Sequence, residues 1–116
     1  MAIDEELAHR LRIRLEGLEG LSEKKMFGGI CFMVNGHMVG AASRTKTGIR
    51  HYLFRVGKGR EDAAARLGAL QPMEQGGRKM TGFYHVDADD CTDEQLSGWL
   101  SLALENAFSL PLKRSA

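Results

Sequence analysis

Leucines recur along the start of the chain at the spacing of an α-helix. Four of them follow one another at intervals of four, four and three residues: Leu7, Leu11, Leu15 and Leu18. This spacing stacks the leucines on one helical face and leaves the charged residues between them on the others. We therefore predict an amphipathic helix over residues 4 to 19, followed by a polar connection at residues 22 to 25.

Asn35-Gly36 separates two apolar runs and predicts a two-residue hairpin turn, because both central positions of a type I′ turn need a positive φ. The two strands are expected at about 28 to 34 and 37 to 43. A third strand is expected at 49 to 56, where aromatic and β-branched residues gather. The turn also predicts a register, with these pairs: Val34 with His37, Met33 with Met38, Phe32 with Val39, and Cys31 with Gly40.

Both faces of this hairpin are apolar, whereas a hairpin with one wet face alternates apolar and polar residues. In the predicted register, the side that meets the helices carries Ile30, Phe32, Val34, Val39 and Ala41. The opposite side carries Cys31, Met33, Met38, Gly40 and Ala42. An apolar face of this kind is either covered by another segment or used for binding, and methionine adapts well to partners. The candidate partner-binding residues are Cys31, Met33, Met38 and Ala42.

The second half of the chain predicts a helix, a hairpin and a final helix. Alanines favour a short helix near residues 60 to 68. Gly76-Gly77 predicts a second hairpin, in which the expected pairs are Glu74 with Lys79 and Met73 with Met80. Its second strand is expected to run from residue 78 to 86.

Thr92 and Gln95 form the pattern of a capping box at the start of the last helix. An apolar stripe follows at helical spacing: Leu96, Trp99, Leu100, Ala103 and Ala107. The predicted order of elements is α-β-β-β-α-β-β-α. This order indicates a two-layer α+β fold, α-β(3)-α-β(2)-α, with an antiparallel sheet and helices on one of its faces.

Composition narrows the class of protein without naming a reaction. The 116 residues suit a single domain, 1–116, and the formal net charge of +1 gives no global attraction to nucleic acid or to an anionic membrane. We see no signal peptide and no run as long as a membrane span, so we expect a cytoplasmic protein without membrane contact. The only two cysteines, Cys31 and Cys91, match no zinc spacing and are expected to be reduced thiols.

No motif predicts a catalytic, cofactor or metal site. The acidic stretch at residues 85 to 94 departs from the calcium-loop pattern and suits the first turn of a helix. The four histidines lie far apart in the sequence, and GKGR at 57 to 60 is too short for a P-loop. Cys31 lies among apolar neighbours in a strand, and the acidic residues around Cys91 oppose the thiolate that the start of the last helix would favour. We therefore expect no enzyme, no cofactor and no metal.

Basic residues gather in the middle of the chain. No acidic residue interrupts the segment from 44 to 60, which holds Arg44, Lys46, Arg50, Arg55, Lys58 and Arg60. With Lys24 and Lys25 they are the candidate nucleic-acid contacts, because each phosphate contact adds salt-dependent affinity. A solvated edge strand that its charges protect from aggregation would have the same composition.

A series of short blocks resembles the TfoX N-terminal-domain family, small bacterial proteins related to regulators of competence. The blocks are Met26-Phe27-Gly28-Gly29 with Phe32 and Gly36, then Tyr52 to Val56, Arg78-Lys79-Met80, Tyr84-His85-Val86, and Leu96 to Trp99. The resemblance spans about residues 5 to 110. It implies a five-stranded antiparallel sheet of order 5-4-1-2-3, similar to secretion-chaperone-like folds, and it supplies no catalytic residues.

Longer members of the family carry a C-terminal domain and are associated with DNA uptake and transcriptional regulation, and we expect a single-domain form here. The first functional hypothesis is a non-enzymatic regulatory or adaptor domain that acts through protein contacts, with a partner or as a homodimer. The alternative is a regulator that binds nucleic acid directly through the basic residues. A thiol enzyme using Cys31 or Cys91 is the least favoured hypothesis.

Overall fold

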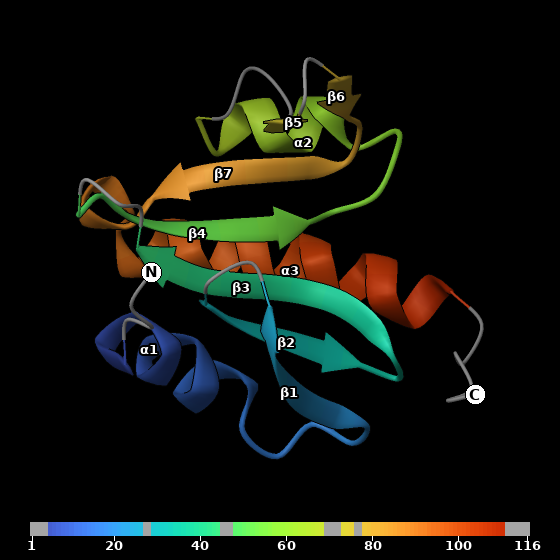
Figure 1. Cartoon of the computed structure of the whole chain (residues 1–116). Coiled ribbons are helices and arrows are strands. Elements are labelled where there is room, and N and C mark those ends of the chain that lie inside the picture. Colours follow the sequence, from blue (N-terminus) through green and yellow to red (C-terminus); the bar gives the residue numbers. More distant parts are fainter. Residues whose placement is uncertain (1–4, 27–28, 45–47, 69–72, 76–77, 111–116) are drawn as a thin grey trace.

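The computed structural model describes residues 5–26, 29–44, 48–68, 73–75 and 78–110. Its elements, in chain order, are α1 (Glu5–Leu15), β1 (Leu21–Met26), β2 (Gly29–Val34), β3 (His37–Arg44), β4 (Arg50–Arg55), α2 (Glu61–Arg66), β5 (Met73–Gln75), β6 (Arg78–Met80), β7 (Phe83–Asp87), the 3-10 helix η1 (Ala88–Asp90) and α3 (Asp93–Ser109). The predicted α+β class is confirmed (Figure 1).

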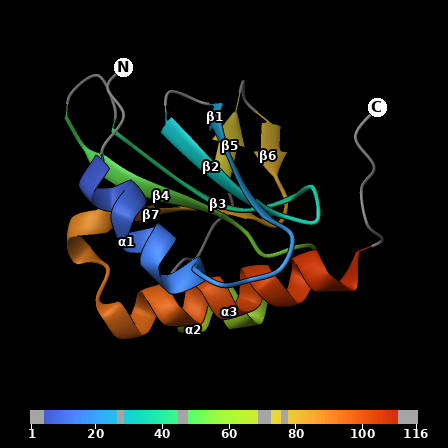
Figure 2. The same cartoon turned by 90° about the horizontal axis from the view of Figure 1, so that it is seen from below.

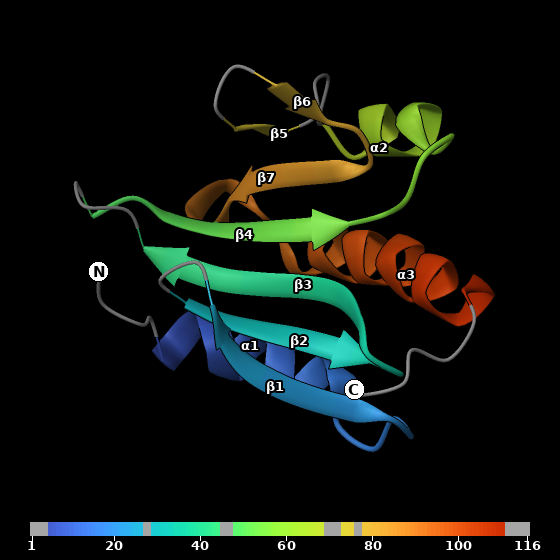
Figure 3. The same ribbon diagram turned by 45° about the vertical axis from the view of Figure 1, so that its right-hand side comes forward.

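Five strands form one antiparallel sheet in the order β1-β2-β3-β4-β7, and β5 and β6 form a separate two-stranded ribbon. The α-helices lie on one side of the sheet, and the ribbon stands on the other side, near β7 (Figures 1 and 2). Figure 3 looks onto the face without helices, with β1 at one edge and β7 at the other. We call this surface the open face.

The expected strand order 5-4-1-2-3 is wrong for two reasons. The first is β1, which occupies the edge beside β2 where a polar connection was predicted. Its residues are polar on both faces, because Lys24 is exposed and Glu23, on the helix side, binds Arg12 with atoms 2.7 and 2.8 Å apart. An edge strand of this kind lacks the apolar alternation from which strands are recognised.

The second reason is a break in the predicted strand 78 to 86. The ribbon keeps the expected pairs Glu74 with Lys79 and Met73 with Met80, but the chain then turns at Thr81-Gly82 before β7 begins. Gly82 has a φ of 87°, and a Cβ there would lie 2.8 Å from the carbonyl carbon of Gly57. This close approach requires glycine, and it separates the ribbon from the main sheet.

The hairpin of β2 and β3 contains a β-bulge that the sequence did not reveal. Asn35 and Gly36 both have positive φ, and the first two predicted pairs, Val34 with His37 and Met33 with Met38, are confirmed. Beyond them the register shifts, so that Phe32 lies opposite Gly40, and Cys31 lies opposite Ala41. A bulge adds one residue to one strand and changes the direction of every side chain beyond it.

The main core lies between the helices and the sheet. Trp99 of α3 is 1% exposed and stacks on Phe54 of β4, with ring centroids 5.6 Å apart and planes 3° from parallel. The predicted capping box at Thr92 and Gln95 is present at the start of α3. Asp93, in the first turn, binds Arg10 and Arg14 of α1 at 2.8 and 2.9 Å, which joins the two helices.

Candidate functional site on the open face of the sheet

The centre of the open face is a small second core. Register places Cys31, Ala41 and Leu53 side by side on three adjacent strands. They are 0%, 4% and 7% exposed, and three partly buried residues pack against them: Met33, Met38 and Phe83. We call these six residues the apolar cluster.

The structure corrects one of the predicted partner-binding residues. Cys31, Met33 and Met38 share the open face, as predicted. Ala42 does not, because the bulge turns it towards the helices, where it is fully buried in the main core. Ala41 takes its place on the open face, so the predicted positions of Ala41 and Ala42 are exchanged.

Sequence reasoning missed Leu53 and Phe83 as members of this cluster. Alternation in the third predicted strand places Leu53 on the same face as His51 and Arg55. It does not indicate that Leu53 lies close to Cys31. Its neighbours follow only from the strand order, since β4 lies between β3 and β7. Phe83 is placed by the same order, and Arg55 lies over its ring, with Cζ 5.7 Å from the ring centroid.

A polar row borders the apolar cluster on the same face. His51 and His85 stack with ring centroids 4.7 Å apart, and His51 Nε2 lies 3.0 Å from Ser43 Oγ. Burial lowers the pKa of both histidines, and Asp87, opposite His51 in the ladder, raises the pKa of His51 by a smaller amount. Both imidazoles are therefore predominantly neutral at pH 7.

This polar row contains a serine, a histidine and an aspartate, but only the serine–histidine hydrogen bond of a Ser–His–Asp triad is present. The Asp87 carboxylate accepts a hydrogen bond from the Asp89 backbone N–H at 3.0 Å. No bond between Asp87 and His51 is present among the described residues, so the carboxylate does not orient the imidazole as it does in a catalytic triad. The residues that the structure describes also form no group of three or more metal-ligating side chains.

Both thiols are buried and poorly suited to nucleophilic chemistry. Burial raises the pKa of Cys31 to about 11, although Lys24 lowers it slightly. Burial also raises the pKa of Cys91, and Arg10 and Arg14 counteract this only in part. Since the thiolate is the nucleophile, neither side chain is activated at neutral pH.

The candidate nucleic-acid contacts are spread over different parts of the molecule. Lys24 and Lys25 are exposed on the β1 edge, and Arg44 ends β3. Lys58 is exposed in the connection between β4 and α2, and Lys46 lies outside the described residues.

The remaining arginines of the basic segment contact other parts of the chain. Arg50 binds Glu6 of α1 at 2.6 Å and Asp89 of η1 at 3.4 Å. Arg60 binds Glu105 of α3 at 3.0 Å, and Arg55 lies over Phe83. These side chains therefore contribute to packing between elements.

Comparison with known proteins gives one match. A family model described as TfoX N-terminal domain matches residues 14–107, which include the whole open face. No curated protein and no solved structure matches the chain. No helix in the described part of the chain is long and apolar enough to cross a membrane.

Proposed function

Since the chain belongs to the TfoX N-terminal domain family, we propose that it is a non-enzymatic regulatory or adaptor domain that acts in the cytoplasm through contacts with another protein. The association of the family with regulators of competence supports a regulatory role. Two free, buried thiols suit a reducing compartment. The raised pKa values of those thiols, and the lack of a bond between His51 and Asp87 among the described residues, support a role without catalysis.

One observation carries the proposal: the sheet has an apolar cluster on the face that no described helix covers. The three side chains at its centre are buried, while Met33 and Met38 beside them are only partly buried. A buried centre with partly exposed methionines at its border resembles the core of a protein interface, which excludes water and adapts to its partner. The partner would bury these methionines further.

The charges around the apolar cluster indicate the chemistry of the partner. Lys24 and Arg55 carry positive charge on the same face, each next to a member of the cluster, and Asp87 carries negative charge in the polar row. An apolar patch with acidic residues at its border would complement the cluster, Lys24 and Arg55. We therefore propose a different protein as the partner, and sedimentation distinguishes it from a second copy of this chain.

Paired glutamate substitutions test this function. Met33→Glu and Met38→Glu place a charge at the border of the cluster, whereas Ile13→Glu and Phe108→Glu place one at helical positions that are already 50% and 54% exposed. Immobilised wild-type protein and both control variants are expected to retain the same specific partner from the native cytoplasm. Both methionine variants should lose it while keeping their far-UV circular dichroism.

Two outcomes would contradict the proposal. Retention of the partner by both methionine variants would remove the open face from the interaction. Salt-dependent binding of short DNA or RNA, lost on neutralising Lys24 and Lys25, would favour the alternative of direct nucleic-acid binding. Sedimentation at high protein concentration distinguishes a different partner from a homodimer, because a protein that stays monomeric does not form the homodimer.

A further inference from the structure

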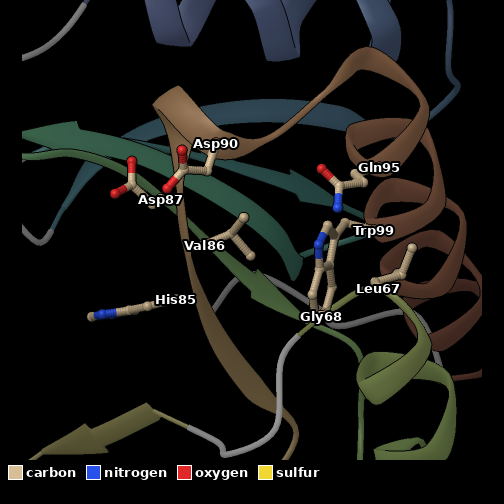
Figure 4. Close-up of a pocket in the computed structure, with 8 residues that line it drawn as sticks. All are labelled: Leu67, Gly68, His85, Val86, Asp87, Asp90, Gln95 and Trp99. Atoms are coloured by element: carbon tan, nitrogen blue, oxygen red, sulfur yellow. The ribbon is translucent and has the colours of Figure 1, made fainter.

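A second site lies at the β7 edge of the sheet, between β7, the end of α2 and the start of α3. It is a pocket of about 230 Å³, and its apolar walls come from Leu67, Val86 and Trp99 (Figure 4). This is smaller than the pockets of about 300–1,000 Å³ that hold drug-sized ligands, so it suits a small group. The pocket shares no residue with the apolar cluster.

The wall of the pocket contains a buried hydrogen-bond donor. The Nε1 atom of Trp99 has no hydrogen-bond partner among the residues that the structure describes. Buried donors are nearly always paired, and an unpaired one costs about 1–3 kcal/mol. The indole is held in place by Phe54 and Tyr84, whose ring centroids each lie 5.6 Å from that of Trp99. The donor therefore has a fixed direction.

Gln95 supplies a second donor at the same place. Its Oε1 atom accepts the backbone N–H of Thr92 at 3.0 Å, as part of the capping box. This bond leaves the Nε2 amide group pointing towards the indole nitrogen of Trp99 (Figure 4). Two donors that face the same gap can share one acceptor oxygen placed between them.

The free edge of β7 contributes backbone groups to the pocket. Val56 N–H donates to Gly82 O at 2.8 Å, which makes this a hydrogen-bonded pair. Hydrogen-bonded and non-hydrogen-bonded pairs alternate along an antiparallel ladder. Leu53 with His85 is consequently a non-hydrogen-bonded pair, as is His51 with Asp87.

The N–H and C=O groups of His85 and Asp87 therefore point away from β4, towards the free edge. Figure 4 shows the His85 and Asp87 side chains on the other side of β7 from Trp99. Both residues line the pocket, so we infer that they do so through their main chain. An edge of this kind offers one donor and one acceptor per outward residue to an extended ligand.

We propose that this pocket binds a neutral amide group. Its carbonyl oxygen accepts hydrogen bonds from Trp99 Nε1 and Gln95 Nε2, and its N–H donates to the outward C=O of His85. The carboxylate of Asp90, one of the lining residues, disfavours a carboxylate in the same position. Either a small carboxamide or one residue of an extended peptide presents this chemistry.

Trp99 is the only tryptophan of the chain, so its indole proton is a single reporter inside the pocket. The probe is N-acetyl-L-alaninamide, a neutral residue flanked by two amide groups, titrated while the indole proton and the His85 and Asp87 amides are followed by NMR. We expect a saturable downfield shift of the indole proton, with shifts of both amides. The anion N-acetyl-L-alanine should bind at least about fivefold more weakly.

Gln95→Glu is the decisive variant, because glutamate retains the capping box but removes the amide donor. It should weaken binding of the probe by about fivefold or more, the loss expected for one net hydrogen bond. Glu94→Gln, a change of opposite charge at the adjacent exposed position, should bind like the wild type. Thermal melts of both variants separate lost binding from lost folding.

Propanamide distinguishes the two sources of the amide group. Equal affinity for propanamide and N-acetyl-L-alaninamide identifies a small carboxamide ligand, whereas tighter binding of the latter identifies a peptide chain. The proposal is overturned by an indole proton that shows no saturable shift up to the solubility limit of both probes. Stronger binding of the anion, or unchanged binding to Gln95→Glu, would also overturn it.

Discussion

Leu53→Ala tests whether the apolar cluster is a true second core. Leu53 is 7% exposed and packs against Cys31 and Ala41 on the open face. The substitution removes the equivalent of about three buried methylene groups, or about 2.4 kcal/mol of transfer free energy. A cavity term adds to this loss, but the partly buried neighbours Met33 and Met38 can move into the space.

We therefore expect the free energy of unfolding to fall by about 2–3 kcal/mol. Urea unfolding followed by far-UV circular dichroism measures this as a lower midpoint with an unchanged slope. The corresponding fall in Tm is about 10 °C. Ile13→Ala, at a position that is 50% exposed, is the matched control and should change stability by less than about 0.5 kcal/mol. A loss below about 1 kcal/mol for Leu53→Ala would refute the second core.

Three further predictions follow from the same contacts. Cys31, with a pKa of about 11, should react with iodoacetamide at pH 7.5 far more slowly than it does in urea, and equal rates would contradict its burial. Folding lowers the pKa of His51 and His85, so the unfolded chain binds more protons than the folded chain as the pH falls. The free energy of unfolding should therefore decline below about pH 6.5. The double variant with glutamine at both positions should flatten that decline in urea titrations. Thr92→Ala should cost about 1 kcal/mol by removing the N-cap of α3, measured against Ser97→Ala as an exposed control.

Local signals in the sequence predicted local structure well. The Asn35-Gly36 turn and the Thr92 capping box each depend on residues within one turn of the chain, and both are confirmed. The apolar stripe of the last helix forms part of the main core, as its spacing predicted. These features follow from backbone conformation and helical period alone.

Features that depend on distant partners could not be read from the sequence. β1 is a strand because β2 supplies its hydrogen bonds, while its own residues are those of a polar connection. The bulge in the β2–β3 hairpin lies next to Gly40, where a Cβ would lie 3.0 Å from Cδ1 of Phe54, its partner on β4. The bulge decides which of Ala41 and Ala42 reaches the open face, and the residues of the Asn35-Gly36 turn do not reveal it.

The candidate site likewise combines residues that local patterns predicted with residues that only the strand order brings together. Cys31, Met33 and Met38 were found from alternation within one hairpin, whereas Leu53 and Phe83 join them only through the order of the strands. The pocket at Trp99 was not predicted at all. Its residues come from β7, η1, α3 and the turn after α2, and the helical spacing of Trp99 indicates only a buried position.

Site-specific photo-crosslinking in cells tests the central claim, that the open face docks a protein, most directly. A photoreactive amino acid is placed at Met38, at the border of the apolar cluster, and in a second strain at Phe108, which is exposed on α3. The account predicts one crosslinked partner band from position 38 and none of that size from position 108. Crosslinking of the partner from position 108 alone would contradict it.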